Sequence, residues 1–518
     1  MSETSYDVVP YANDAHPQTH IAHLFTIGRL FNLTPPDFRK ARVLDLGCAS
    51  GSNIIPMAAE YADAQFVGID LSDAQIRRGQ DLIGRAGLKN IVLKAQSIAD
   101  FGTSGEPFDY IICHGVFSWI PPDIRTSLLK IVRQNLSPNG LAVVSYNAMP
   151  GWGAVRSLRD IMLYHTAGFP TPAEKVAQAR ALLQFILDSQ GDFNSPYRAF
   201  LEQEVNLLKA ANPNYFFHEY LEEHNQPFYL HEVVAMAARE DLAYLGDTDM
   251  PSMFLGNYTP HVGKLLAGTN DPVRIEQYLD FVTNRRFRSS VLMVAGASIN
   301  RSMAAARIEE FWLQSLLQPE TPVADGELAP DAVVRFNAET GLTYTASGAP
   351  IVALLSALCR HGRPATVTEI VAEARERYRL PQSEAELRRS LCETALHLFL
   401  ARGLELRSDP ARYVDTLSER PVVLPLARAQ AVDSDRVTNA FHRSVIFDPL
   451  GRFILRAVDG SRDRAALTAY LMTAVASGQL KLEHEGNAVT DAAAIERNAA
   501  AAVDHFLSAF RANALLSA

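Results

Sequence analysis

The chain has 518 residues, of which 48% are hydrophobic and 20% charged, and its formal net charge is -10. At roughly 100 to 200 residues per domain, this length indicates about three domains. The acidic balance, without any basic block, argues against a protein that binds nucleic-acid phosphates.

Cysteine usage and the N-terminal sequence bear on the cellular compartment. The four cysteines form no CxxC and no Cys/His pair at metal-ligand spacing, which predicts a reduced compartment and no metal site. The first 20 residues lack the basic and apolar segments of a signal peptide. No apolar run approaches the roughly 20 residues that span a bilayer. These features predict a cytoplasmic protein.

Short apolar segments alternate with amphipathic ones from residue 42 to residue 146. Strands are expected at residues 42–46, 65–70, 91–95, 108–113 and 141–146. Helices are expected between them, one of them starting at Ser72 or Asp73 as an N-cap. Strands that alternate with helices predict an α/β fold with a parallel sheet, which binds ligands outside the carboxyl ends of its strands.

The alternation stops after Tyr146 and resumes near residue 228. Residues 150–227 have a helical pattern, and two further strands are expected at 242–247 and 287–296. We interpret this as a helical insertion after which the sheet is completed. The alternative is that the residues from 228 onward form a separate small domain.

Two linkers divide the remainder of the chain. Residues 317–330 are rich in proline and acids, and residues 407–421 form a second polar stretch. Between them, three amphipathic helices followed by a strand at 404–408 suggest a winged-helix-like module. The predicted domains are a core of residues 1–300 with an arm of 1–40 and a completing segment of about 215–300, a mainly helical middle domain of 301–406, and a C-terminal substrate or partner domain of 420–518.

The segment VLDLGCASGSN (43–53) places a glycine loop between the first strand and the first helix. Gly47 permits a turn that other residues avoid, and Gly51 is expected to let the backbone approach a ligand. The spacing is GxxxG, whereas a dinucleotide site requires GxGxxG. Asp45 beside this loop would repel a diphosphate and attract an ammonium or a sulfonium group.

Asp70 ends the second strand, where an acid accepts hydrogen bonds from the two hydroxyls of a ribose. A pocket with an adenosine at one end and a cationic amino acid at the other fits S-adenosylmethionine. The alternative is an ordinary glycine turn with a solvated Asp70.

The segment FDYIICHGVFSWIP (108–121) is expected to supply the reactive end of the pocket. His114 should face the methyl group, while Phe117 and Trp119 wall a narrow, dry tunnel that favours in-line transfer. An amine nucleophile must lose a proton, and the candidate acceptors are His114, Tyr11, Tyr146 or a water. Alternatively, His114 only hydrogen-bonds the cofactor or a loop carbonyl.

These motifs resemble those of class I S-adenosylmethionine-dependent methyltransferases. Further segments, among them SYDVVPY, PQTH, LSPNGLAVVSYNAMPGW, NRRFRSSVL and RPVVLPLARAQA, make the chain similar to bacterial protein-lysine methyltransferases of the type that modifies rickettsial outer membrane proteins. The resemblance covers nearly the whole chain. It implies a Rossmann-like seven-stranded core, a methyltransferase regulatory domain and C-terminal domains that help to hold a protein substrate.

The resemblance also implies a set of cofactor contacts. The expected cofactor-binding residues are Asp45, Gly47, Cys48, Ala49, Gly51, Asn53, Asp70, Leu71, Gln75, Ser97, Ile98 and His114. Many methyltransferases carry Asp where Ser97 stands, so this chain departs from the family pattern at the contact with the adenine amino group. The N-terminal arm, with Tyr6, Tyr11 and His20, is expected to fold over the cofactor.

The expected substrate-binding residues are Phe117, Trp119, Trp152, Glu219 and Glu222. The two glutamates could attract a segment that carries lysine, and a solvated acidic face is the alternative. His218 and Glu222 lie four apart on one helix, but a zinc motif would require a second histidine in place of the glutamate.

The leading hypothesis is methyl transfer from S-adenosylmethionine to lysine Nε of a protein, leaving S-adenosylhomocysteine. The alternatives are a small-molecule O- or N-methyltransferase and a cofactor-binding regulatory scaffold without turnover. GxSxG, GxxxxGK[ST] and HExxH motifs are absent. Expected partners are a lysine-bearing protein such as an outer membrane protein and a second copy in a homodimer, without nucleic acid, metal or membrane insertion.

Overall fold

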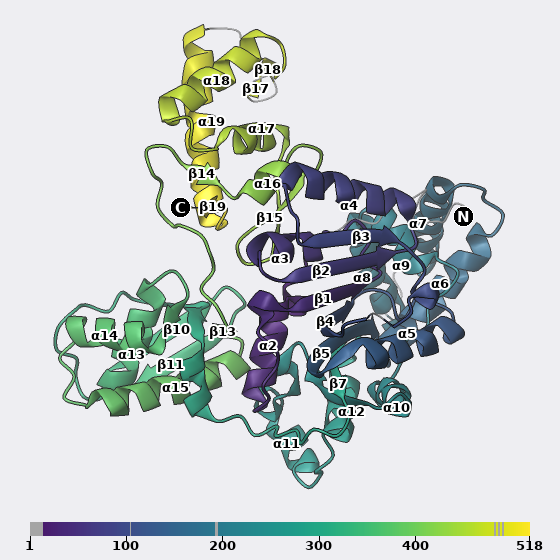
Figure 1. Ribbon diagram of the computed structural model, residues 1–518, viewed down its shortest axis with the longest axis horizontal. Coiled ribbons are helices and arrows are strands. Elements are labelled where there is room, and N and C mark those ends of the chain that lie inside the picture. Colours follow the sequence, from purple (N-terminus) through teal and green to yellow (C-terminus); the bar gives the residue numbers. More distant parts are fainter. Residues whose placement is uncertain are drawn as a thin grey trace.

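The computed structural model describes residues 14–517 apart from residue 104, residues 192–194 and 481–482, 485–486 and 489–491. Figure 1 shows a core that carries the large sheet, a middle domain below it to the left and a C-terminal domain above. Helix α2 (Ile21–Leu30) lies between the sheet and the middle domain. In the described part of the chain, no helix combines the length and apolar character needed to cross a bilayer.

The core is built on a seven-stranded sheet of order β3-β2-β1-β4-β5-β7-β6. The strands are β1 (Arg42–Leu46), β2 (Gln65–Asp70), β3 (Ile91–Ala95), β4 (Phe108–Cys113), β5 (Leu136–Asn147), β6 (Leu242–Asp247) and β7 (Phe287–Val294). Strands β1 to β5 pair in parallel, and β7 pairs antiparallel with β5 and β6. The sheet is therefore completed after the insertion, as predicted, and residues 228–294 do not form a separate domain.

Helices cover both faces of the sheet. They are α3 (Ile54–Glu60), α4 (Asp73–Ala86), α5 (Pro122–Asn135), α10 (Leu230–Arg239) and α12 (Pro272–Thr283). The expected cap Ser72 accepts a hydrogen bond from the N–H of Gln75 at 3.2 Å. Along β1, Val43 packs into the core under α2, α3 and α4, whereas Leu44 packs into the core under α5 and α10. This alternation buries both faces of the strand.

The insertion consists of α6 (Gly151–Thr166), α7 (Pro172–Ser189), α8 (Pro196–Ala210) and α9 (Pro213–Tyr220). These helices share an apolar core of their own, with Trp152, Met162, Leu183 and Phe216 among its residues. The insertion leaves the sheet at the end of β5 and thus starts at the carboxyl edge, where a ligand site is expected.

A buried charge cluster joins α12 to the last two strands. The Arg288 guanidinium donates to Asp280 at 2.7 and 2.9 Å, to Glu276 at 3.1 Å and to Asp247 at 3.2 Å. Tyr244 donates its hydroxyl hydrogen to Glu276 at 2.6 Å. Because all these side chains are buried, the cluster depends on every partner being present.

The middle domain has a three-stranded sheet and three helices. These elements are β8 (Trp312–Ser315), β12 (Ala365–Thr366), β13 (Leu404–Arg407), α13 (Ala349–Arg360), α14 (Val367–Arg377) and α15 (Glu384–Leu400). The helices and β13 were predicted.

The expected linker 317–330 instead begins with a strand. Strand β9 (Leu317–Pro319) pairs with β10 (Val333–Ala338), which pairs with β11 (Thr343–Ser347). These strands bury few side chains, so their hydrophobic alternation is weak in the sequence.

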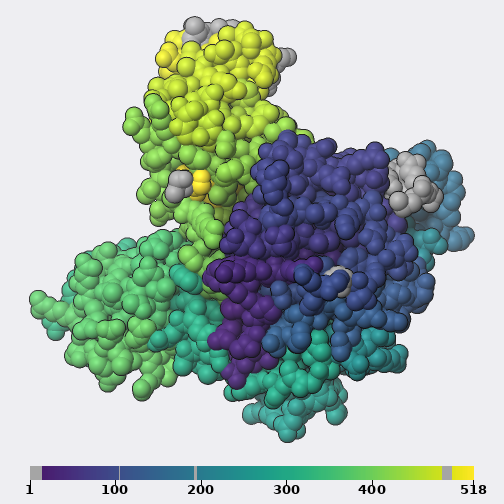
Figure 2. Space-filling view, viewed as in Figure 1, coloured from purple at the N-terminus to yellow at the C-terminus, as the bar shows by residue number. Residues whose placement is uncertain are grey.

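The C-terminal domain has a separate core. Its elements are β14 (Val422–Val423), α16 (Pro425–Gln430), β15 (Arg436–Thr438), β16 (Ser444–Ile446), α17 (Pro449–Ala457), α18 (Arg464–Ala476), α19 (Ala492–Ala512) and β19 (Leu516–Ser517). Phe453, Leu471 and Phe510 belong to this core. Figure 2 shows the domain as a separate lobe that meets the core at its base.

Candidate active site

A cavity of about 660 Å³ lies at the carboxyl edge of the sheet. The loops after β1, β2 and β4 contribute to its wall, and so do helices α6 and α9 of the insertion. The N-terminal strap, residues 14–19, contributes Asp14 and His16 to the wall. The expected cofactor residues that line the cavity are Asp45, Gly47, Cys48, Ala49, Asn53, Asp70, Leu71, Gln75, Ser97, Ile98 and His114.

The glycine loop is held by the end of β2. The N–H groups of Gly47 and Cys48 both donate to the carbonyl of Ile69, at 2.9 and 3.0 Å. Asp70 accepts from the N–H of Ala49 at 2.8 Å and from the N–H of Ser72 at 2.9 Å. Asp70 is therefore fixed by backbone donors from the loop after β1 and from the loop after β2.

The two glycines of the loop both have a positive φ, but a Cβ would meet different neighbours at the two positions. Gly47 has a φ of +81°, and a Cβ there would lie 2.4 Å from Val116 Cγ2. Gly51 has a φ of +75°, and its Cβ would meet the side chains of Ile55 and Leu93 at 3.0 Å. Gly51 does not line the cavity. Gly51 thus allows a turn packed against the core, and its expected role in letting the backbone approach a ligand stays a prediction.

Asp45 is a buried acid that faces the cavity. Burial, reinforced by the negative charge of Asp70, raises the pKa of Asp45 to about 8. A cation beside Asp45 would reverse this shift, because it favours the carboxylate form. Burial also raises the pKa of the Cys48 thiol, so this cysteine is not a thiolate nucleophile at neutral pH.

His114 lies beyond the end of β4 and lines the cavity. Its ring centroid is 4.1 Å from that of His16 and 5.7 Å from that of Phe287. Burial, with a further contribution from His16, lowers the pKa of His114 to about 3. Its Nδ1 is buried, without a hydrogen-bond partner among the residues that the structure describes. His114 is thus a neutral imidazole at physiological pH.

Two residues expected at the reactive end are directed into the core. Phe117 is fully buried, with its ring centroid 5.4 Å from that of Phe228. The Tyr146 hydroxyl shares a hydrogen bond of 2.9 Å with Ser290 Oγ on β7, and burial raises the pKa of Tyr146. Neither side chain lines the cavity, so Phe117 does not wall it and Tyr146 is not placed to accept a proton there.

Aromatic side chains and one carboxylate line the half of the cavity away from the glycine loop. Trp119, Trp152, Tyr215 and Tyr220 contribute the aromatic surface, and Trp152 stacks on Tyr220 with ring centroids 6.0 Å apart. Glu219 lines the same half, and burial raises its pKa to about 7. An acid among aromatic rings suits an amine on a flexible apolar stem.

The remaining predicted residues have other places. Glu222 forms a 2.7 Å hydrogen bond with His218 Nδ1 and does not itself line the cavity, whereas His218 does. His20 caps α2, since its Nδ1 accepts from the N–H of Ala22 at 3.3 Å, and it faces a second cavity. Tyr6 and Tyr11 lie outside the described residues. In the part of the chain that the structure describes, no group of His, Cys, Asp or Glu is arranged to hold a metal ion.

Several residues of the wall were not predicted from the sequence. They include Asp14, His16, Asn147, Arg286 and Phe287. Because β7 runs antiparallel to its neighbours, its first residues lie at the carboxyl edge, beside the end of β5. The motif NRRFRSSVL at this position was the available signal, although its strand direction was not predicted.

Three segments match described families. Residues 37–175 match a methyltransferase domain, residues 212–293 a predicted methyltransferase regulatory domain, and residues 419–515 the C-terminal winged helix domain of PKMT. The winged-helix family thus matches the last domain, whereas the sequence pattern predicted a winged-helix-like module in the middle domain.

One relative and one solved structure match over almost the whole length, and a second relative matches about half of it. An uncharacterised protein of Rickettsia prowazekii is 35% identical over 99% of this chain and 93% of its own length. A second uncharacterised protein of the same organism is 39% identical over 47% of this chain and 98% of its own. The structure of PKMT2 from Rickettsia typhi in complex with AdoHcy is similar with a TM-score of 0.87 and 31% identity, covering 98% of this chain and 100% of that one.

Proposed function

Because this chain belongs to the PKMT family of S-adenosylmethionine-dependent protein-lysine methyltransferases, we propose that its reaction takes place in the 660 Å³ cavity at the carboxyl edge of the sheet. The resemblance and the leading functional hypothesis drawn from the sequence are confirmed at the level of the family. The residues that perform the reaction are the subject of the proposal.

The glycine-loop half of the cavity fits the cofactor. Asp70 lies at the end of β2, where a carboxylate accepts hydrogen bonds from ribose hydroxyls. Asp45 is a buried acid with a raised pKa, and the amino group of the cofactor's methionine end would place a cation beside it. Leu71, Ser97 and Ile98 line the same cavity and would surround the adenine. The similar PKMT2 of Rickettsia typhi has been solved with AdoHcy.

The aromatic half fits the substrate lysine. Its stem would lie against Trp119 and Trp152, and its nitrogen would reach Glu219. Lysine must be neutral to act as a nucleophile, and a carboxylate whose pKa is about 7 can hold the proton that the ammonium loses. Glu222 acts indirectly in this proposal, since it orients His218 in the cavity wall.

Methyl transfer needs alignment and exclusion of water more than it needs acid or base chemistry. Bound S-adenosylmethionine supplies a methyl group on a sulfonium centre. His114 is neutral and too weak a base to take a proton from lysine, so we assign it a positioning role at the boundary between the two halves. In the proposed in-line displacement, the bond from lysine Nε to the methyl carbon forms as the sulfur-carbon bond breaks, and the nitrogen gives up one proton.

The observation that carries the proposal is that one cavity joins an acid-lined half at the glycine loop to an aromatic half with a half-buried glutamate. The test uses S-adenosylmethionine with a labelled methyl group, added to the full chain with membrane-protein, soluble-protein and metabolite fractions. Base-stable label on lysine, identified by mass spectrometry and lost with Asp70→Ala, is the expected result. Label in metabolites alone would favour a small-molecule enzyme, and cofactor binding without label would favour a regulatory scaffold.

The resemblance extends the proposal to the partners. We propose an outer membrane protein as substrate, a cytoplasmic site of action and a homodimer. The labelled fractions identify the substrate, and size-exclusion chromatography with light scattering determines the number of copies.

A further inference from the structure

The hairpin β15–β16 of the C-terminal domain binds the N-terminal strap, more than 400 positions away in the sequence. The Arg436 guanidinium contacts both carboxylate oxygens of Asp14, at 2.8 and 3.1 Å. Ser444 Oγ accepts a hydrogen bond from the N–H of Ala15 at 3.2 Å. Two residues of the hairpin therefore fix the start of the described strap.

A third hairpin residue reaches the glycine loop itself. His442 Nε2 lies 3.0 Å from Asn53 Oδ1, and the same oxygen accepts from the N–H of His16 at 3.0 Å. The Asn53 amide nitrogen donates to Thr19 Oγ1 at 2.9 Å, which fixes the orientation of the amide. Because Oδ1 is an acceptor, His442 must carry its hydrogen on Nε2 and donate it.

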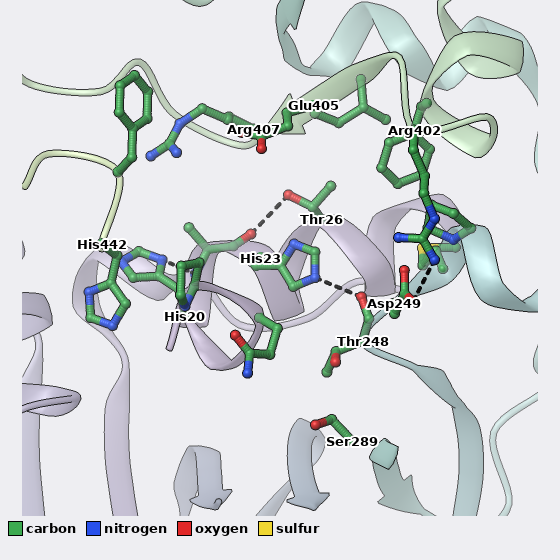
Figure 3. Close-up of a pocket in the computed structure, with 18 of the residues that line it drawn as sticks. His20, His23, Thr26, Thr248, Asp249, Ser289, Arg402, Glu405, Arg407 and His442 are labelled. Carbon is green, nitrogen blue, oxygen red and sulfur yellow. Dashed lines mark hydrogen bonds and ion pairs between the residues drawn. The ribbon is translucent and has the colours of Figure 1, made fainter. Parts of the chain in front are cut away.

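His442 is built into this position. It lies between the two hairpin strands with a φ of +57°, and only 5% of its surface is exposed. Its ring centroid is 4.8 Å from that of His20, and Figure 3 shows the two rings together at one end of the second cavity. Burial, with further contributions from His20 and His16, lowers the pKa of His442, so the ring stays neutral and keeps one donor and one acceptor nitrogen.

These contacts end at the wall of the cofactor cavity. Asp14, His16 and Asn53 all line it, and His16 lies against His114. The hairpin therefore holds strap residues that themselves line the cavity. Another contact between the same two domains, the ion pair of Arg85 and Asp433 at 2.8 Å, lies on the surface and joins residues that do not line this cavity.

We propose that His442 and Arg436 of the C-terminal domain are positioning residues for the cofactor, which act through Asn53 and the strap. The last domain then contributes to cofactor affinity, in addition to any role in holding the protein substrate. The inference rests on the proposed assignment of the cofactor to this cavity and names a further part of the same site.

The test is calorimetric titration of S-adenosylhomocysteine into the full chain and three variants. His442→Leu removes the donor, and His442→Gln keeps an amide N–H that can reach Asn53. Arg85→Ala breaks the surface ion pair between the same domains and is the matched control. Neither leucine nor glutamine is β-branched, so both variants carry a similar backbone strain at the positive φ of residue 442. A difference in Kd between them therefore does not come from that strain.

We expect Kd to rise about three- to tenfold with His442→Leu, the range of one net hydrogen bond. His442→Gln should recover most of this loss, and Arg85→Ala should match the parent chain. Equal affinity for His442→Leu and the parent would overturn the inference, and so would equal losses in the Leu and Gln variants. Failure of the parent chain to bind S-adenosylhomocysteine would instead overturn the proposed cofactor site.

A second variant covers the case in which His442→Leu fails to fold. Arg436→Gln removes the ion pair with Asp14 at a half-buried position, so cooperative unfolding is expected to be retained. The Kd of Arg436→Gln for S-adenosylhomocysteine should rise in the same range. Its KM for the protein substrate should stay within about twofold of the parent value, because effects at separate sites are additive to about that precision. A rise in KM with no change in Kd would contradict a cofactor-positioning role.

Discussion

The main-chain N–H of Ala49 donates to Asp70 Oδ2 at 2.8 Å, so the acid proposed to hold the ribose also fixes the glycine loop. The other oxygen of Asp70 accepts from the N–H of Ser72, the cap of α4. A single carboxylate thereby joins two loops of the cofactor cavity.

Replacement of Asp70 should therefore weaken cofactor binding. Asp70→Ala removes the carboxylate oxygens that are proposed to accept from the ribose hydroxyls. We expect the affinity for S-adenosylhomocysteine to fall by about a hundredfold or more, because each hydrogen bond to a charged group contributes about 1.5–3 kcal/mol. Asp70→Asn retains one acceptor and should lose less. Calorimetry gives both values, with Asp81→Asn, at an exposed position on α4, as control. Parent-like binding by the Ala variant would contradict the assignment.

The raised pKa of Asp45 leads us to expect that cofactor binding releases a proton. With a pKa of about 8, Asp45 is mostly protonated at pH 7 in the free protein, and a bound ammonium favours its carboxylate. Affinity should rise with pH up to about 8 and then level off, and binding at pH 7 should release close to one proton. Titration in buffers of different ionisation enthalpy measures this release. Asp45→Asn should abolish it, and an unchanged release in that variant would exclude Asp45 as the source.

His114 should affect the rate without setting the pH profile. Because its pKa is about 3, its ionisation lies below the range in which lysine methylation is measured. We expect His114→Asn to reduce kcat by less than the roughly 100- to 10,000-fold typical of a lost general base. The apparent pKa values of the kcat profile should not move. Disappearance of a limb between pH 6 and pH 8 would instead identify His114 as the proton acceptor.

Glu219 should govern the acidic limb of the activity profile. Its pKa of about 7 means that the carboxylate forms as the pH rises through neutrality, so kcat/KM for the lysine substrate should rise there. Glu219→Gln should lower kcat/KM by about tenfold or more, the value of a charge-assisted hydrogen bond, and should remove this limb. The control is Glu202→Gln, at an exposed position on α8. If the Glu219→Gln variant retained the limb, the limb would belong to another group.

The sequence could bring together those residues of the candidate site whose positions follow from local rules. Parallel strands end at one edge, so Asp45 and Asp70 could be placed together from their positions at the ends of β1 and β2. Tyr146 shows where such rules fail. Side chains alternate along β5, so Tyr146 points into the core while Asn147, one residue later, faces the cavity.

Other parts of the site depend on tertiary packing that no periodicity records. Asp14 and Asn53 meet Arg436 and His442 through contacts between domains, and these pairs are separated by hundreds of residues. Phe287 reaches the wall because its strand is antiparallel, a direction that the apolar pattern does not encode.

We expect replacement of Arg288 to cause a large loss of stability. Arg288→Met removes the cation shared by Asp247, Glu276 and Asp280 and leaves buried carboxylates without it. Breaking a buried pair in this way typically costs about 3–5 kcal/mol. The first urea transition, followed by tryptophan fluorescence, should shift to lower concentration. Arg239→Met, at an exposed position on α10, should leave it in place.

The contact between Arg436 and Asp14 also has a consequence for the timing of biosynthesis. The ribosome makes the strap more than 400 residues before the hairpin that holds it. Strand β5 likewise remains without its partner β7 until the insertion has been translated. A nascent chain can therefore assemble its glycine loop early, but the cavity proposed for the cofactor is completed only after the hairpin has been translated. Products of premature termination would then lack part of the machinery needed to use the methyl donor.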